Sequence, residues 1–414
     1  MNKGDRIVIV GGGFAGLQMA RALNKSDFKV TLIDRQNHHQ FQPLFYQVAS
    51  AGLDPSSISF PFRKIFQDSE NIEIRMADVT KINPDTNSLD TSIGSVEYDH
   101  LIIATGCKTN YFGNDEIGKH ALSMKSTEEA IGIRNQLLLS FEKMMSATEE
   151  EKEALLNIVI VGAGPTGVEL SGAFAEMKKK ILPKDFPHFD FSKLQIILLE
   201  GSKNTLNNMS DAAKKASRKY LEKLGVIVKT ETIVSSYDGK TICLSNGEKI
   251  SAANVIWAAG VTGNTIEGIR KESCIRNRLI VNRYNKVDGY ENIYCIGDVA
   301  YMQTPLYPNG HPQLANVAIN QGKNLAKNFF RTLKNKPLKE YEYKDLGSMA
   351  TIGKNKAVVD LPRIKFQGRL AWYVWMFLHL MLILSVKNKL IIFINWAWSY
   401  FNHDSSLRLI LKSK

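Results

Sequence analysis

The sequence predicts an α/β protein with two dinucleotide-binding units and a helical C-terminal tail. Three observations predict this fold. One glycine-rich loop follows an apolar run near the N-terminus, a second follows another apolar run near residue 160, and the C-terminal region combines positive charge with apolar, aromatic segments. The chain has 414 residues, of which 44% are hydrophobic, so it can bury the cores of two or three domains.

The first loop, residues 11–16 (GGGFAG), follows the apolar run 7–10. In such a turn between strand and helix, the first glycine permits the tight turn, the second lets the backbone approach a pyrophosphate, and the third lets helix pack on strand. Asp34 closes the next apolar run, at about the 20-residue spacing at which a carboxylate holds a ribose hydroxyl. The loop is therefore expected to hold the adenosine half of FAD or NAD through Gly11, Gly13, Phe14, Ala15 and Gly16.

The second loop, residues 162–167 (GAGPTG), follows the apolar run 158–161. Glu200 closes the next strand at a longer separation, which we attribute to an inserted segment, 178–192, rich in lysine, proline and phenylalanine. A carboxylate at Glu200 repels a 2′-phosphate, so NADH is preferred over NADPH. In the alternative interpretation, Asp34 and Glu200 are solvated strand ends. The expected nucleotide contacts of this loop are Gly162, Gly164, Pro165, Thr166 and Gly167.

A late apolar strand, residues 294–298 (YCIGD), indicates which loop holds the flavin. Asp298 can accept hydrogen bonds from a ribityl chain, and the helix that starts near Ala315 would face the flavin ring. Residues 101–106 (LIIATG) and 255–260 (VIWAAG) form a further duplication, and each ends in a small-residue turn where backbone can approach a cofactor. The pattern predicts an FAD domain interrupted by an NAD domain. The two turns contain Thr105, Gly106, Ala259 and Gly260.

Longer motifs give a resemblance to a known family. They are Asp34-Arg35 with residues 40–49 (QFQPLFYQVA), the loop 162–170 with Val168-Glu169-Leu170, residues 257–261 and the segment 395–400 (NWAWSY). With these motifs the chain resembles the type II NADH dehydrogenases, which are single-subunit, non-pumping NADH:quinone oxidoreductases. The resemblance covers residues 1 to about 410 and implies two Rossmann-like domains of the flavoprotein fold that binds two dinucleotides.

The resemblance also implies site residues. The first loop with Asp34 would contact FAD, and the second loop with Glu200, Ala259 and Gly260 would hold NADH. Glu169 would lie near both the nicotinamide and the flavin ring. Further FAD contacts implied by the resemblance are Arg35, Gln42, Val79, Thr105, Gly106, Asp298 and Val317.

The family's quinone motif, A-Q-x-A-x-Q, is altered in this chain. Residues 315–320 read ANVAIN, so the quinone contacts expected from the motif are Ala315, Asn316, Ala318 and Asn320. Each asparagine keeps the amide of the expected glutamine but withdraws it by one methylene, which is enough to lose a direct hydrogen bond. The motif leaves the identity of the quinone open. In the alternative interpretation, these asparagines only line or cap the helix.

The expected reaction is hydride transfer from nicotinamide C4 to flavin N5, followed by two-electron, two-proton reduction of a membrane quinone. Glu169 is the predicted catalytic residue. A carboxyl enclosed between two rings has a raised pKa and can relay protons or steer the nicotinamide. The alternative is a partner of the helix dipole in the first turns of its helix. The chain has no series of intramembrane ionisable residues, so proton pumping is not expected.

The four cysteines, Cys107, Cys243, Cys274 and Cys295, include no C-x-x-C or zinc-type spacing, so disulfide-reductase chemistry is not expected and no metal site is predicted. Nucleic-acid binding is not expected either, because no recognition motif accompanies the positive charge. Two other functions stay open. One is a soluble NAD(P)H-dependent flavoprotein reductase of a small redox protein, and the other is a non-enzymatic NADH sensor.

Residues 331–414 carry fifteen Lys/Arg against five Asp/Glu, which is ten of the chain's twelve net positive charges. Residues 370–386 are apolar apart from His379 and Ser385, a basic turn follows at 387–389, and 390–401 is aromatic and apolar. This pattern predicts a helical hairpin in the membrane interface. A membrane span and a buried contact in a homodimer are the alternatives. The basic residues expected to meet anionic lipid headgroups are Arg363, Lys365, Arg369 and Arg408.

These observations divide the chain into an FAD domain at 1–110 and 270–330, an NADH domain at 111–269 and a membrane-association region at 331–414. Residues 127–153 are expected to form a charged helix with a break and restart at 146–151. The first strand begins by Ile7, which leaves no room for a secretory or organellar presequence. We therefore expect a peripheral protein on the cytoplasmic face of a bacterial inner membrane.

Overall fold

The computed structural model describes residues 1–402 and 407–410. The chain forms two compact units, each assembled from separate segments. Unit 1 contains Met1–Gln40, Phe60–Lys108 and Val261–Asp345. Unit 2 contains Phe41–Ser59, Thr109–Gly260 and Leu346–Lys414.

Unit 1 is built on a five-stranded parallel sheet with the order β21-β9-β1-β2-β5. Its central strands are almost entirely apolar, as expected for a parallel sheet that is buried on both faces. The strands are β1 (Arg6–Val10), β2 (Lys29–Asp34), β5 (Ile72–Met76), β9 (His100–Ile103) and β21 (Ile293–Cys295).

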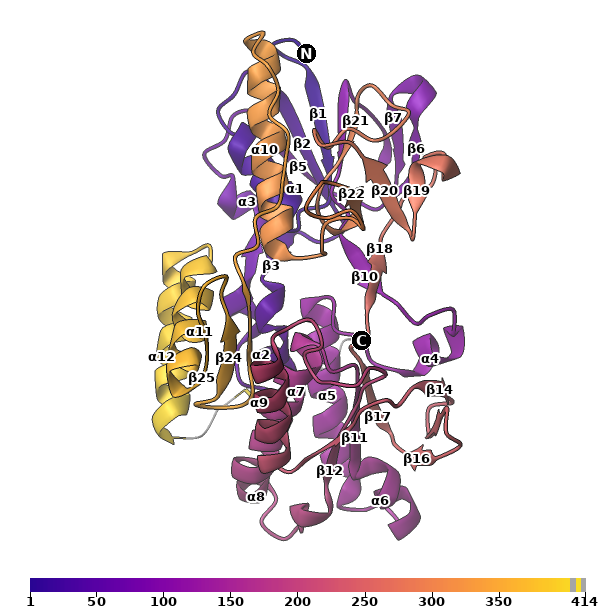
Figure 1. Cartoon of the computed structure of the whole chain (residues 1–414), viewed down its shortest axis with the longest axis vertical. Coiled ribbons are helices and arrows are strands. Elements are labelled where there is room, and N and C mark those ends of the chain that lie inside the picture. The colour runs from indigo at the N-terminus through magenta and orange to yellow at the C-terminus, as the bar shows by residue number, and fades with distance from the viewer. Residues whose placement is uncertain (403–406, 411–414) are drawn as a thin grey trace. The chain divides into compact units, whose positions relative to one another are not determined.

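Helices α1 (Phe14–Leu23) and α10 (Ala315–Leu333) pack against each other on one face of this sheet, and α10 is the long orange helix of Figure 1. Gly322 permits the contact, because a Cβ there would lie 2.6 Å from the carbonyl oxygen of Ala15. Smaller elements complete unit 1: α3 (Phe62–Ile65), the meander β6 (Val79–Asn83), β7 (Ser88–Thr91) and β8 (Gly94–Glu97), and the sheet of β19 (Cys274–Ile275), β20 (Arg278–Val281) and β22 (Ala300–Met302).

Unit 2 repeats this plan with a four-stranded parallel sheet of order β13-β12-β11-β17. The strands are β11 (Asn157–Val161), β12 (Gln195–Leu199), β13 (Val226–Lys229) and β17 (Asn254–Trp257). Around it lie α2 (Phe45–Ala49), α4 (Asp115–His120), α5 (Thr127–Met144), α7 (Pro165–Lys180), α8 (Leu182–Asp185), α9 (Asp211–Lys223), and the antiparallel sheet of β14 (Val234–Tyr237), β15 (Thr241–Leu244) and β16 (Lys249–Ser251).

The predicted break at 146–151 is confirmed: α5 ends at Met144 and α6 (Glu149–Leu155) begins after it. Both helices start with a capping box, in which Ser126 pairs with Glu129 and Thr148 pairs with Glu151. Each box satisfies backbone N–H groups that have no partner inside the helix. The sequence therefore encodes two separate helix starts.

The C-terminal part of unit 2 contains a three-stranded antiparallel sheet that the sequence analysis did not predict: β23 (Ser348–Thr351), β24 (Ala357–Asp360) and β25 (Lys365–Gly368). Helices α11 (Arg369–Leu382) and α12 (Val386–Asn402) follow; they lie side by side, and α11 packs against β24 and β25 (Figure 1). The break between the helices falls at 383–385 rather than at the basic turn 387–389, because the carbonyl of Ser385 accepts the amide of Lys389 and starts α12 early. Among the described residues, no helix is both long and apolar enough to cross a membrane.

Candidate functional site

The first glycine loop shows what each glycine does. Gly11 has a φ of +102°, and a Cβ there would lie 2.4 Å from the carbonyl oxygen of Ala104. At Gly16 a Cβ would lie 1.8 Å from the carbonyl oxygen of Gly11, so only glycine lets α1 start this close to β1. A Cβ at Gly13 would meet no described atom within 4 Å. The first and third glycines are thus packing requirements, and the second borders open space at the helix start.

The second loop has the same geometry. Gly162 has a φ of +101° and approaches Ala259, where a Cβ would lie 2.5 Å from the Cα. A Cβ at Gly167 would lie 1.9 Å from the carbonyl oxygen of Gly162, while one at Gly164 would meet no described atom within 4 Å. Two loops with the same steric requirements provide two equivalent surfaces for a pyrophosphate.

The two acidic strand ends also match. Asp34 accepts the amide of Gly12 at 2.6 Å and the amide of Gln36 at 2.7 Å. Glu200 accepts the amide of Ala163 at 2.6 Å and the amide of Ser202 at 2.8 Å. Each carboxylate thus lies beside its glycine loop. A carboxylate has about four lone-pair positions, so each acid retains capacity to accept a ribose hydroxyl.

The N-termini of three helices have uncapped backbone N–H groups that can bind phosphates. In the described chain, α1, α7 and α10 begin at Gly13, Gly164 and Leu314 without a side-chain cap. By contrast, Ser126 caps α5 and Ser210 caps α9. Uncapped first-turn N–H groups are the groups that bind anions or polar ligand atoms.

Asp298 and the start of α10 lie together in unit 1. Gln313 donates to the carbonyl of Asp298 at 3.1 Å, and the Sγ of Cys107 donates to the Oδ2 of Asp298 at 3.1 Å. Gln321 accepts the amide of Gly297 at 2.7 Å, while its Nε2 is buried without a partner among the described residues. An orphaned buried donor beside the predicted flavin residues fits a polar ligand. The residues of unit 1 therefore fit FAD.

The remaining residues predicted to bind FAD differ in their position and burial. The hydroxyl of Thr105 donates to the carbonyl of Asn264 at 2.5 Å, and Gly106 has a φ of +70°. Phe14 and Ala15 lie in the first turn of α1, Val79 starts β6, and Val317 is buried in α10. Arg35 is exposed after β2. Gln42 is exposed in unit 2, so the structure does not group it with the others.

The predicted quinone motif occupies the first turns of α10 in unit 1, where Ala318 is buried and Ala315, Asn316 and Asn320 are half-buried. Asparagines recur every four residues along this helix. Asn324 and Asn328 both donate to the carbonyl of Lys339, at 3.0 and 2.9 Å, and have a structural role. Asn316 and Asn320 lie at the other end of this row.

In unit 2, Pro165 and Thr166 form the first turn of α7, and Ala259 and Gly260 follow β17. Glu169 lies one turn further along α7 and is 9% exposed. Its Oε1 accepts the amide of Thr351 at 3.3 Å. Burial raises the pKa of Glu169 to about 8, and interactions with the Thr351 amide and the Trp375 indole oppose this rise. At neutral pH this carboxyl therefore holds a proton.

Glu169 reaches Thr351 because α7 and β23 pack closely. A Cβ at Gly172 would lie 2.6 Å from the amide nitrogen of Gly353. Any other residue at position 172 would push the end of β23 away from the helix. The sequence analysis missed both Gly172 and Thr351, because no local pattern links residues that are about 180 positions apart.

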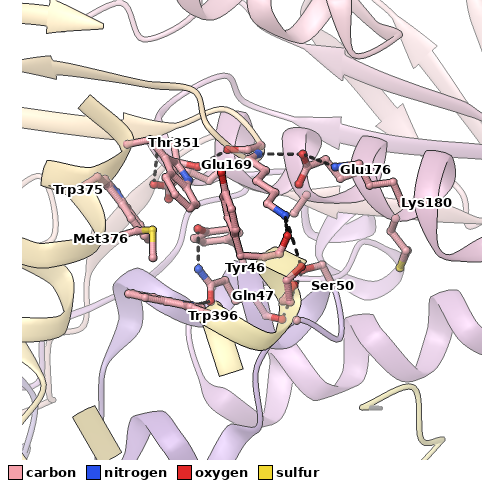
Figure 2. A pocket seen from close by; sticks show the side chains of 18 of the residues that line it. Tyr46, Gln47, Ser50, Glu169, Glu176, Lys180, Thr351, Trp375, Met376 and Trp396 are labelled. Carbon is pink, nitrogen blue, oxygen red and sulfur yellow. Dashed lines mark hydrogen bonds and ion pairs between the residues drawn. The ribbon is translucent and has the colours of Figure 1, made fainter. Parts of the chain in front are cut away.

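A pocket of about 170 Å³ lies beside Glu169 (Figure 2). Three segments line it: residues 46–52, helix α7, and the C-terminal part from Thr351 to Tyr400. Trp375 and Trp396 from α11 and α12 form an aromatic wall, with ring centroids 6.0 Å apart. The sequence analysis included residues 46–49 and 396 in its family motifs but assigned them no role.

Polar contacts hold α12 against this pocket. The Nε1 of Trp396 donates to the Oε1 of Gln47 at 2.8 Å. The Nζ of Lys354 donates to the carbonyls of Ser399 and Tyr400 at the last turn of α12. At the other end of the helix, Asn388 donates to the carbonyls of Ser56 and Ser57 at 3.1 and 2.9 Å. The pocket wall is therefore fixed along the length of α12.

All four cysteines are described, and none of them forms a disulfide bond with another described residue. No group of three or more metal-ligating side chains was found among the described residues. Arg408 forms an ion pair with Asp185 at 2.5 Å.

Comparison with known proteins agrees with this geometry. A family model for pyridine nucleotide-disulphide oxidoreductases matches residues 5–322, and a model for the NDH2 C-terminal domain matches residues 346–402. The type II NADH:quinone oxidoreductase Ndh of Mycobacterium tuberculosis is 32% identical, over 96% of this chain and 88% of the relative. The chain belongs to the type II NADH:quinone oxidoreductase family.

Other relatives of this family support the assignment. The type II NADH:quinone oxidoreductase of Staphylococcus aureus is 26% identical, over 85% of this chain and 89% of the relative. The structure of NDH2 from Plasmodium falciparum in complex with NADH has a TM-score of 0.90 at 23% identity, over 99% of this chain and all of that one. At this identity the structural match establishes the fold alone.

The glycine geometry predicts that two similar substitutions affect different properties, one FAD binding and the other the stability of the fold. Gly13→Ala should fold normally but bind FAD at least tenfold more weakly, because the new methyl occupies the space beside the helix start. Gly16→Ala should lower the thermal stability of the flavin-free protein, since overpacking costs about 1–3 kcal/mol. Thermal unfolding and FAD titration of the apoprotein measure both effects. A Gly13→Ala protein that is unstable but binds FAD normally would contradict this assignment.

Proposed function

We propose that the protein oxidises NADH through bound FAD and reduces a quinone, without pumping protons. The observation that carries this proposal is the pocket beside Glu169, which a nucleotide-binding helix and an aromatic C-terminal region line together. When bound, the cofactor supplies the redox chemistry, accepting a hydride from NADH and passing two electrons on. The chain's own residues bind, orient and protonate the reactants.

In unit 1, the first loop, Asp34 and the start of α10 would hold FAD. Gly13 leaves room for the pyrophosphate, Asp34 would accept from the ribose, and Asp298 would accept from the ribityl chain. The sequence resemblance implies further contacts with FAD, and we propose them for Arg35, Gln42, Val79, Thr105, Gly106 and Val317.

In unit 2, the second loop with Glu200, Ala259 and Gly260 would hold NADH. Glu200 accepts the loop amide of Ala163 at 2.6 Å, which supports the proposal that it binds a ribose hydroxyl. A 2′-phosphate there would be repelled by the Glu200 carboxylate. The site therefore selects NADH.

Glu169 is proposed as the catalytic acid. Its carboxyl is buried and neutral at pH 7, and it lines the pocket, so it can supply a proton to a bound acceptor. Asn316 and Asn320, with Ala315 and Ala318, are proposed as the quinone-motif residues of unit 1. Because each asparagine is shorter than the family's glutamine, water can fill the resulting gap and bridge to the quinone.

The C-terminal region is proposed to bind the surface of a membrane. Apolar side chains on α11 and α12 are exposed, with Phe377 at 61%, Phe393 at 54%, Trp398 at 64% and Phe401 at 77%. Exposed aromatic and aliphatic side chains on one helical surface are typical of interfacial helices. Arg363, Lys365 and Arg369 are exposed and can meet anionic headgroups. We propose the cytoplasmic face of a bacterial inner membrane as the location. The alternative is that the same apolar surface forms the contact of a homodimer.

A soluble reductase of a small redox protein is disfavoured, because it would not need the NDH2-type C-terminal region that matches residues 346–402. A non-enzymatic NADH sensor is distinguished by kinetics, since a sensor binds NADH without rapid turnover.

Single-turnover kinetics tests the proposal and the role of Glu169 together. In the wild type, NADH should bleach the flavin within milliseconds and a soluble quinone should reoxidise it. The reoxidation rate should fall as the pH rises through about 8, because Glu169 then loses its proton. Glu169→Gln should bind NADH normally, slow reoxidation by about 10²-fold and lose this pH dependence.

Two outcomes would contradict these proposals separately. If the wild-type flavin is not reduced by NADH or not reoxidised by quinone, the function is wrong. If Glu169→Gln retains the wild-type rate and pH profile, the function stands and Glu169 is not the acid.

Nucleotide selectivity follows from Glu200. The wild type should prefer NADH over NADPH by at least tenfold in kcat/KM, which is about 1.4 kcal/mol. Glu200→Ser should narrow this preference, since the repulsion of a 2′-phosphate is removed. Steady-state kinetics with both nucleotides measures the change. Equal use of NADH and NADPH by the wild type would show that Glu200 does not select between them.

Membrane binding is tested with point variants, because truncation before the C-terminal region would also remove Thr351, which binds Glu169. Phe393→Asp and Trp398→Asp place charges on the exposed surface of α12 and should reduce co-sedimentation with anionic lipid vesicles severalfold. Met145→Asp, which places the same charge on an exposed apolar residue at the C-terminal end of α5, is the matched control. Flavin reduction by NADH should be unchanged in all three. Full vesicle binding by the α12 variants would refute the membrane proposal, and a change of oligomeric state instead would favour the dimer.

A further inference from the structure

A chain of hydrogen bonds runs from the C-terminal helix into the pocket (Figure 2). Trp396 on α12 donates to the Oε1 of Gln47 at 2.8 Å, and the Nε2 of Gln47 donates to the hydroxyl of Tyr46 at 2.9 Å. Tyr46, Gln47 and Trp396 all line the pocket that contains Glu169. The residues at the two ends are 350 positions apart, so only the fold joins them.

The direction of this chain is fixed by chemistry. An indole N–H can only donate, so the amide oxygen of Gln47 must face Trp396. The amide nitrogen of Gln47 then faces Tyr46 and donates to the phenol oxygen. Tyr46 is therefore the acceptor in this bond, and its own proton is directed away from Gln47.

The surroundings of Tyr46 keep that proton in place. The ring is 7% exposed and packs edge-on against Trp375, with centroids 6.3 Å apart. Burial raises the pKa of Tyr46 well above its usual value, and the nearby Glu169 raises it further. The side chains of Gln47 and Thr351 oppose the rise by interacting with the phenol oxygen. The phenol is thus neutral at every physiological pH.

We propose that Tyr46 is a second catalytic residue, which donates a hydrogen bond and then its proton to a carbonyl oxygen of the bound quinone, and that Trp396 sets this direction through Gln47. The inference rests on the function proposed above. Tyr46 and Glu169 then act in series within one pocket.

The step balances in electrons and protons. A quinone becomes a hydroquinone by taking two electrons and two protons. Both electrons and one proton would come from reduced FAD, when bound, and Tyr46 would supply the other proton by breaking its O–H bond. The phenolate oxygen regains a proton from the neutral carboxyl of Glu169 through pocket water. Bulk water then reprotonates Glu169.

Three variants test the direction of the chain. Tyr46→Phe keeps the ring packing but removes the proton. Gln47→Glu is nearly isosteric, but its carboxylate accepts from both Trp396 and Tyr46, so it turns the phenol proton away from the pocket. Trp396→Phe removes the donor that orients Gln47 and allows the amide to flip. Tyr237→Phe is the matched control, because Tyr237 is a buried tyrosine of unit 2 outside the pocket whose hydroxyl donates to Ala252.

The full-length holoenzyme is studied in single turnovers with NADH and then with either a soluble quinone or ferricyanide, which accepts electrons without protons. Tyr46→Phe and Gln47→Glu should both slow reoxidation by quinone, about 10²-fold. Their rates with NADH and with ferricyanide should stay within twofold of the wild type. Trp396→Phe should have an intermediate effect, and Tyr237→Phe none. The solvent deuterium isotope effect on quinone reoxidation should disappear in Tyr46→Phe.

The outcomes separate this inference from the proposed function. A wild type that does not reduce quinone refutes the function itself. An active wild type with unaffected Tyr46→Phe kinetics refutes only the role of Tyr46. If Tyr46→Phe slows ferricyanide as much as quinone, or if Gln47→Glu behaves like wild type, Tyr46 shapes the pocket but does not deliver a proton.

Discussion

The burial of Glu169 is the constraint around which unit 2 is organised. A buried carboxyl group is stable only if it is neutral or hydrogen-bonded, and here it is both. Three segments distant in sequence enclose it: residues 46–52, helix α7 and the C-terminal region. Gly172 makes this possible, because without a side chain at that position the turn at Gly353 can approach α7 closely enough for Thr351 to bind the carboxyl.

The two units show how one scaffold acquires two uses. Their loops share the same steric requirements at the first and third glycine, and their acids bind the loops in the same way. The differences lie outside the loops. Unit 1 adds α10 with the unsatisfied amide of Gln321 beside Gly297, whereas unit 2 adds a titratable carboxyl on the helix that follows its loop. Duplication thus provides nucleotide binding twice, and later segments distinguish the chemistry of the two sites.

The sequence predicted the features that depend on local patterns. The glycine loops, the acids at the strand ends, the restart of the helix near Thr148 and the two C-terminal helices all have short-range signals. The sheet of β23–β25, the inclusion of residues 41–59 in unit 2 and the contact between Gln47 and Trp396 have none. These features depend on packing between segments hundreds of residues apart. For the same reason the ion pair between Arg408 and Asp185 has no signal in the sequence.

Helix α12 has one face that packs against unit 2 and one face that is exposed. Asn388, Ile392 and Trp396 follow one another at four-residue steps and face the body of unit 2, where they bind or are buried. Phe393, Trp398 and Phe401 are exposed on the rest of the helix. A partner that covers the exposed side chains, whether lipid or protein, therefore leaves the bond from Trp396 to Gln47 in place. The direction of the Tyr46 proton depends on the side chains of α12 that pack against unit 2. Binding to a membrane or a partner protein depends on the exposed side chains of the same helix. Substitutions on one face can therefore alter one of these two properties without the other.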